Sequence, residues 1–150
     1  MKIKQLLPFL FGISLSADQF SFILYNDFFV GTDKHFTNGA SLTWIDDEKH
    51  FDKYDLGVSI NQMMITPTDL SKKEPQYNDI PYIGYLYISS YMIEVKNDSF
   101  FEYRVEAGVV GPDSGAEETQ NTFHSIIGSE RVEGWDTQLG RYYKCTFSLW

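Results

Sequence analysis

The sequence predicts an all-β chain of antiparallel strands with one short helix inserted between them. Three observations support this fold class. Apolar and polar residues alternate over several short segments, as they do in strands that show one face to water. Aromatic residues make up 17% of the chain, and β-strands favour them. Between residues 115 and 127 the alternation gives way to spacings of three and four, which are typical of a helix.

The N-terminus has the three parts of a secretory signal peptide. Two lysines precede an apolar run over residues 6–15, and small residues follow it at 16 and 17. The run is too short to cross a bilayer as a helix. The segment 1–17 is therefore predicted to be removed on export, which leaves a mature domain of residues 18–150. A buried N-terminal strand or helix is the alternative interpretation of the same run.

The composition excludes several classes of protein. A single cysteine, Cys145, cannot form an internal disulfide, so the chain is not a small disulfide-bonded scaffold. The formal net charge is −9 and no basic patch stands out, which argues against nucleic acid as a partner. The excess of carboxylates is compatible with cation binding, but an acidic surface explains it equally well.

Six segments are predicted to be strands, and glycine, proline or charged residues separate them. The first segment ends near Asn26 and Asp27, and a polar connection over 30–39 follows it. The proline-rich stretch 66–81 is predicted to be a long exposed loop. The two segments before the helix form a hairpin. The predicted strands are residues 18–27, 39–46, 56–62, 82–95 and 99–110 and the alternating tail at 141–150.

The predicted strand at 99–110 has apolar side chains on one face and charged side chains on the other. This pattern is typical of the wall of a water-lined β-barrel. A half-buried sheet in a soluble protein gives the same pattern, so this strand alone leaves both architectures open. The apolar face holds Phe101, Tyr103, Val105 and Ala107, and the other face holds Glu102, Arg104, Glu106 and Gly108.

The predicted helix has recognisable ends. Ser114 and Glu117 have the spacing of a capping box, and Gly128 stands where a C-terminal cap is expected. A helix between strands usually packs on a core, but a helix with polar residues on one face can also present them to a substrate. The predicted polar face holds Glu117, Gln120 and His124, and the predicted apolar flank holds Phe123, Ile126 and Ile127.

Four ordered segments carry a family resemblance: YNDFFVGTDKHFTNG, SINQMMITPTDL, NDIPYIGYLY and GVVGPDSGAEETQNTFHSIIG with GWDTQL. Together they resemble the outer-membrane lipid A 3′-O-deacylase family. The resemblance implies a twelve-stranded antiparallel β-barrel in the outer membrane of a Gram-negative bacterium. It also implies a hydrolase that removes the 3′-linked acyloxyacyl chain of lipid A. The implied active site lies near the outer leaflet, beside a helix from an extracellular loop.

The resemblance assigns catalytic roles to four positions. His124 matches the family's catalytic histidine, and imidazole suits a general base because it titrates near neutral pH. Glu130 matches a family carboxylate, which is expected to orient the imidazole by accepting its other ring proton. Asn26 and Thr37 match further site residues, and Thr37 is expected to hydrogen-bond the substrate or a metal-bound water. The two other histidines stand in polar turns and are interpreted as surface residues.

The same resemblance implies a calcium ion and two substrate contacts. Asp27 is expected to bind Ca²⁺ with Asn26 beside it, since this ion prefers hard oxygen ligands. Adjacent strand residues point to opposite faces, so both can serve one site only if the strand bulges or one of them contributes main chain. Lys72 and Gln120 are expected to bind substrate, lipid A or lipopolysaccharide. Water attack is favoured over an acyl-enzyme, because no G-x-S-x-G motif is present.

The resemblance covers the chain up to about Leu139, and the six predicted strands are about half of the family barrel. We therefore expect a domain that is incomplete at its C-terminus. A catalytically inactive fragment or a structural outer-membrane protein is the alternative to an active deacylase, and a soluble secreted β-domain is a third. Unpaired strand edges are costly in lipid, so self-association of two chains could close one barrel.

Overall fold

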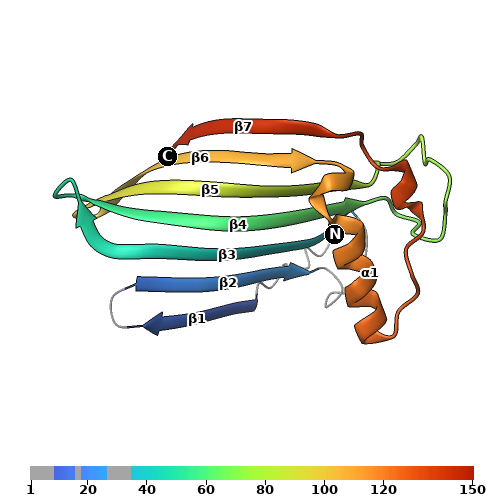
Figure 1. The fold of residues 1–150 in the computed structure, drawn as a ribbon, viewed down its shortest axis with the longest axis horizontal. Helices are drawn as coiled ribbons and strands as arrows, with labels where there is room; N and C mark the ends of the chain where they lie inside the picture. The colour runs from blue at the N-terminus through green and yellow to red at the C-terminus, as the bar shows by residue number, and fades with distance from the viewer. Residues whose placement is uncertain (1–8, 16–17, 27–34) are drawn as a thin grey trace.

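The computed structural model describes residues 9–15, 18–26 and 35–150, with side chains for 18–25, 38–46 and 48–150. Its main feature is one antiparallel sheet in which strands adjacent in sequence are adjacent in space (Figure 1). The prediction of an all-β antiparallel fold with one inserted helix is confirmed, and the sheet is open between its two outer strands. The strands are β1 (Phe9–Leu15), β2 (Asp18–Asn26), β3 (His35–His50), β4 (Tyr54–Thr66), β5 (Ile83–Lys96), β6 (Ser99–Val110) and β7 (Tyr142–Leu149).

Strand β1 lies within the predicted signal peptide. In the full-length chain it pairs with β2 over the whole of its length, from Phe9↔Leu24 to Leu15↔Asp18. This pairing agrees with the alternative interpretation of an N-terminal strand. The predicted cleavage point at residues 16–17 lies outside the described residues, so removal of the signal peptide stays a prediction.

The sheet has an apolar face and a polar face. Neighbouring strands place Phe22, Leu42, Ile60 and Ile88 side by side, and these side chains are between 41% and 56% exposed. We call this side the apolar face. A continuous exposed band of this kind is typical of the lipid-facing wall of an outer-membrane barrel. Strands β3 to β6 have 12 to 16 residues each, and about 9–11 residues suffice for a strand to cross a bilayer.

The polar face carries a network of hydrogen bonds and ion pairs. Arg104 lies 2.6 Å from a Glu102 carboxylate oxygen and 3.7 Å from one of Glu106. The Ser89 hydroxyl donates to Glu106 at 3.2 Å, and neighbouring hydroxyl and amide groups of β3 and β4 extend the network. These contacts confirm the predicted charged face of the strand at 99–110. Among the described residues, no helix is long and apolar enough to cross a membrane.

The two ends of the sheet differ in how their strands are joined. At one end, tight turns at residues 51–53 and 97–98 connect β3 to β4 and β5 to β6. At the other end lie the loop 67–82 and the segment 111–141, which contains α1 (Ala116–Ile127) and the short helices η2 (Pro112–Ser114) and η3 (Gly134–Thr137) (Figure 1). Outer-membrane barrels have short periplasmic turns and longer extracellular loops. The helix end therefore corresponds to the extracellular side of such a barrel.

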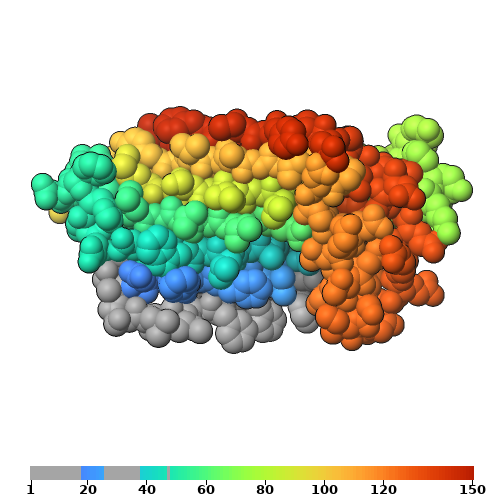
Figure 2. All heavy atoms as spheres, in the orientation of Figure 1, coloured from blue at the N-terminus to red at the C-terminus, as the bar shows by residue number. Residues whose placement is uncertain are grey.

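A small core beneath α1 fixes the helix to the sheet. It consists of Met64, Tyr82, Ala116, Val132 and Trp135, each no more than 2% exposed. Met64 follows Ile60 by four residues on β4, so it continues the apolar face toward the strand end. Gly84 lies on β5 and pairs with Met64 of β4. It lets the helix approach the sheet closely, because a Cβ at this position would lie 2.5 Å from the Ala116 Cβ. Figure 2 shows α1 packed against the ends of the strands.

Candidate active site

Helix α1 begins and ends at glycines. Gly115 is the N-cap in a left-handed conformation with φ of 66°, and no side chain caps the helix. The predicted capping box is wrong, because Ser114 ends the preceding helix η2 and Glu117 instead forms an ion pair with Arg131 at 3.2 Å. The predicted C-terminal cap is confirmed: Gly128 has φ of 73° and its N–H bonds to the His124 carbonyl.

The buried side of α1 is the predicted polar face. Gln120 is 2% exposed and His124 is 9% exposed, whereas Ile126 is 76% exposed. Helical spacing therefore grouped these residues correctly, and of the two alternatives the polar face is the one turned toward the protein. Buried polar side chains need partners within the protein or a ligand. The helix therefore holds polar side chains against the sheet as well as contributing Ala116 to the core.

The orientation of the His124 ring is set by a main-chain carbonyl. The Nδ1 atom lies 2.7 Å from the carbonyl oxygen of Glu130. A carbonyl can only accept, so Nδ1 carries a proton, and in the neutral ring Nε2 then carries the lone pair that a general base needs. The expectation that the Glu130 carboxylate accepts this proton is corrected, because the contact comes from the main chain and Glu130 is exposed.

Asn121 holds the segment that presents this carbonyl. Its Oδ1 accepts the Val132 N–H at 2.9 Å, and its Nδ2 donates to the Val132 carbonyl at 3.3 Å. The two bonds fasten residues 129–132 to the side of α1 and so place the Glu130 carbonyl beside His124. Asn121 was not predicted as a site residue, because its contact joins residues that no motif relates.

Replacing Asn121 by leucine is expected to loosen this segment. A typical hydrogen bond contributes about 0.5–1.5 kcal/mol, and the variant removes two. Trypsin should then cleave after Arg131, whose side chain is 69% exposed, several-fold faster than in the native chain. The matched control, Thr122→Ala, changes an exposed neighbour on the same helix and should cleave at the native rate. Equal cleavage of all three proteins would contradict the role given to Asn121.

Gln120 is bonded to a residue that the sequence analysis did not single out. The Trp135 indole N–H donates to Gln120 Oε1 at 2.7 Å, and Trp135 is fully buried. Gln120 Nε2 is buried and has no hydrogen-bond partner within the described part of the chain. Trp135 lies in the segment GWDTQL, one of the segments that carry the family resemblance. Nothing in that segment indicated its contact with Gln120.

The predicted strand-end residues are placed only in part. Asn26 is the last residue of β2, and its Cα pairs with that of Asn38. Thr37 is the extra residue of an irregularity in β3 between Phe36 and Asn38, a bulge of the kind that re-aims side chains beside active sites. The side chains of Asn26 and Thr37, and all of Asp27, lie outside the described residues. Their convergence on His124 therefore stays a prediction.

Asn38 is a buried amide beside these positions. It is 8% exposed, and its Oδ1 has no hydrogen-bond partner within the described ranges. Asn38 lies on β3 and pairs with Met64 of β4, so it lies next to the core beneath α1. An unpaired buried acceptor costs about 1–3 kcal/mol, which is reason to expect a ligand there.

Lys72 lies in the loop 67–82. Its Nζ is 3.4 Å from the Asp69 carboxylate, and its side chain is 57% exposed. Hydrogen bonds from Ser71 lower the pKa of Asp69, which keeps this carboxylate charged beside the lysine. The Lys72 carbonyl lies close to Gly134, so the loop packs against the segment that follows α1. The structure thus places Lys72 on the surface near this segment, and its substrate contact stays a prediction.

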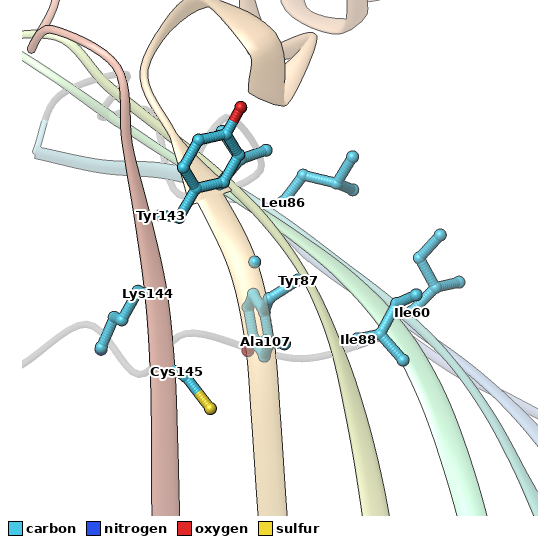
Figure 3. Close-up of a pocket in the computed structure, with 10 residues that line it drawn as sticks. Ile60, Leu86, Tyr87, Ile88, Ala107, Tyr143, Lys144 and Cys145 are labelled. Carbon is cyan, nitrogen blue, oxygen red and sulfur yellow. The ribbon is translucent and has the colours of Figure 1, made fainter.

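One hollow of the described surface lies away from these residues. It has a volume of about 560 Å³ and is lined mainly by β4 to β7. Figure 3 shows Ile60, Ile88 and Cys145 pointing to one side of the strands and Lys144 to the other. None of the predicted site residues lines it. Within the described ranges, no three His, Cys, Asp or Glu side chains gather as a metal site.

The comparisons with known proteins agree with this fold. A family model described as "Outer membrane protein LpxR" matches residues 6–149. Among solved structures, LpxR from Salmonella typhimurium superposes with a TM-score of 0.66 at 27% sequence identity, over 77% of this chain and 39% of that one. The chain thus spans about two-fifths of that relative. A comparison with curated proteins found no match.

The family match corrects one expectation and confirms another. It extends through the C-terminal segment, where β7 pairs with β6, so the resemblance does not end near Leu139. The family predicted from the four sequence segments is confirmed. The chain belongs to the LpxR family of outer membrane proteins.

Proposed function

We propose that this chain hydrolyses the ester that links the 3′ acyloxyacyl chain to lipid A in the outer membrane of a Gram-negative bacterium. The observation that best supports this proposal is the position of His124. Helix α1 packs on the continuation of the apolar face, beside Met64 and Gly84, and not on the polar face. A base held there is within reach of an ester whose acyl chains lie along the lipid-facing wall. Membership of the LpxR family supports the same substrate.

The arrangement of His124 supports a direct attack of water. Nε2 takes a proton from the water as its oxygen bonds to the ester carbonyl carbon. The Nδ1–H bond to the Glu130 carbonyl stabilises the imidazolium that forms. The tetrahedral species then breaks its bond to the sugar oxygen, which takes the proton from His124. The products are the free acyloxyacyl acid and the 3′ hydroxyl of the sugar.

One described residue supports the proposal of a calcium ion at the strand ends. Asn38 offers a buried amide oxygen that has no donor among the described residues, directly opposite the main chain of Asn26. Hard oxygens of this kind are calcium ligands. We propose that Asp27, Asn26 and Asn38 hold Ca²⁺. When bound, the ion polarises the ester carbonyl.

Calcium binding can be measured apart from activity. We expect Tb³⁺, a luminescent calcium analogue, to bind the native protein and Ca²⁺ to displace it. Asn38→Ala should weaken Tb³⁺ binding about tenfold, which corresponds to one ligand worth about 1.4 kcal/mol. Asn78→Ala, at an exposed asparagine of the loop 67–82, is the matched control and should bind as the native protein does. Equal affinity of the native protein and Asn38→Ala would remove Asn38 from the site.

The proposed function is tested by the lipid A of producing cells. A Gram-negative host whose lipid A keeps all its chains should lose the 3′ acyloxyacyl chain when it produces this protein. Mass spectrometry of extracted lipid A gives the mass lost, and fragmentation gives its position. An unchanged lipid A profile, with the protein present in the outer membrane fraction, would contradict the proposal.

A structural or inactive outer-membrane protein is the second candidate, and the open sheet favours it. The outer edges of β1 and β7 have no partner strand among the described residues, and unpaired backbone groups are costly in lipid. Self-association of two chains through these edges is one way to close the wall. Chemical cross-linking in detergent should then give a dimer. This candidate predicts a dimer with unchanged lipid A, whereas the deacylase predicts altered lipid A.

A further inference from the structure

Gln120 and Trp135 form a buried pair one helical turn before the base. Trp135 is 0% exposed, and its ring packs against Tyr82 with centroids 5.0 Å apart. Its position is therefore set by the core beneath α1 and does not depend on Gln120. The indole Nε1 lies 2.7 Å from Gln120 Oε1, while Gln120 and His124 share the buried side of the helix.

The indole determines which way the Gln120 amide points. An indole N–H can only donate, so the glutamine atom that faces it must be the oxygen. The NH₂ group must then point away from Trp135. That group is buried and has no partner in the described part of the chain. An unsatisfied buried donor is destabilising, so its retention one turn from His124 indicates a ligand acceptor.

We infer that Trp135 is a positioning residue that holds the Gln120 amide with its N–H bonds directed at the carbonyl oxygen of the ester. This inference rests on the proposed function. As water adds to the carbonyl carbon, that oxygen gains negative charge, and a donor fixed in advance stabilises it. Gln120 donates a hydrogen bond and exchanges no proton, so the hydrolysis itself is unchanged. Without the indole the amide can rotate and present its oxygen, which repels the developing charge.

A double-mutant cycle separates this role from simple packing. Gln120→Met removes the amide and should lower kcat about 10²-fold, the typical effect of losing one oxyanion donor. Trp135→Phe keeps an aromatic ring in the core but removes the N–H, and we expect kcat about tenfold lower with KM little changed. In the Gln120→Met background, Trp135→Phe should change kcat less than about twofold, because no amide remains to be oriented. Leu70→Ala, which trims a side chain packed on the same core, controls for loosened packing and should act equally in both backgrounds.

Gln120→Glu tests the same idea without altering the core. Its carboxylate can still accept the indole N–H, but it offers an oxygen where the amide offered a donor. We expect a loss of kcat at least as large as for Gln120→Met. If Trp135→Phe fails to fold, Gln120→Glu still tests whether the enzyme needs a hydrogen-bond donor at position 120.

Two results would overturn the inference. The first is a Trp135→Phe effect of equal size in both backgrounds, which would make Trp135 a packing residue only. The second is native activity in Gln120→Glu. A native protein that releases no acyl chain would remove the proposed function and this inference with it. That outcome is distinguishable, because both overturning results require an active native protein.

Discussion

Replacing His124 by asparagine is expected to lower the rate of acyl-chain release about 10²- to 10⁴-fold, the usual contribution of a general base. Asparagine is close in size and its Nδ2 can still donate to the Glu130 carbonyl, so the end of α1 should keep its structure. It has no group that can take a proton from water. The release of acyl chain from lipid A, measured by mass spectrometry over time, gives the rate.

The control for this substitution is Ser125→Ala, an exposed position next to His124 on the same helix. It should hydrolyse lipid A at the native rate. Both proteins should show the native melting temperature to within a few degrees. Retention of more than about a tenth of the native rate by His124→Asn would mean that another group supplies the base.

Replacing Gly84 by valine is expected to lower the rate about 10²-fold although the residue touches no substrate. Any side chain at this position of β5 would meet the Ala116 Cβ at 2.5 Å and the Ser114 hydroxyl even closer. The start of α1 must then move away from the sheet, and His124 moves with it. Misplacement of a catalytic group by about 1 Å can cost about 10²-fold in rate. Overpacking of this kind also costs about 1–3 kcal/mol of stability.

Gly140 provides the matched control for Gly84. It lies before β7, and a Cβ there would meet no atom within 4 Å. Gly140→Val should therefore keep both the native rate and the native melting temperature. If Gly84→Val were as active as Gly140→Val, the contact between α1 and β5 would not determine the position of the base.

The alternation of apolar and polar residues was sufficient to predict the sheet. The strand at 99–110 has the bounds and the faces that the pattern indicated, because charged residues alternate with apolar ones over its middle, from Phe101 to Ala107. The pattern did not predict the start of β3, where apolar and polar residues do not alternate. Residues 35–38 read as part of a polar connection, yet β3 begins at His35, because pairing with β4 continues across a bulge. Pairing is a property of two strands, and one segment cannot show it.

The candidate site was predicted in its residue types but not in its contacts. Helical spacing placed Gln120 and His124 on one face, and the structure buries both. The partners that orient them are the Glu130 carbonyl and the Trp135 indole. Every residue has a main-chain carbonyl, so the sequence cannot show which carbonyl accepts a hydrogen bond. A tryptophan in a loop likewise does not indicate which residue its indole N–H will contact. Both contacts depend on how the segment 128–137 folds back on α1.

The most direct test is hydrolysis by the purified chain alone. The protein, folded in detergent with Ca²⁺, is incubated with lipid A of known acylation, and the products are identified by mass spectrometry. We expect the native protein to remove the 3′ acyloxyacyl chain and lipid A to stay intact with His124→Asn. Intact lipid A with a folded native protein, or equal release by both proteins, would contradict an active site built around His124.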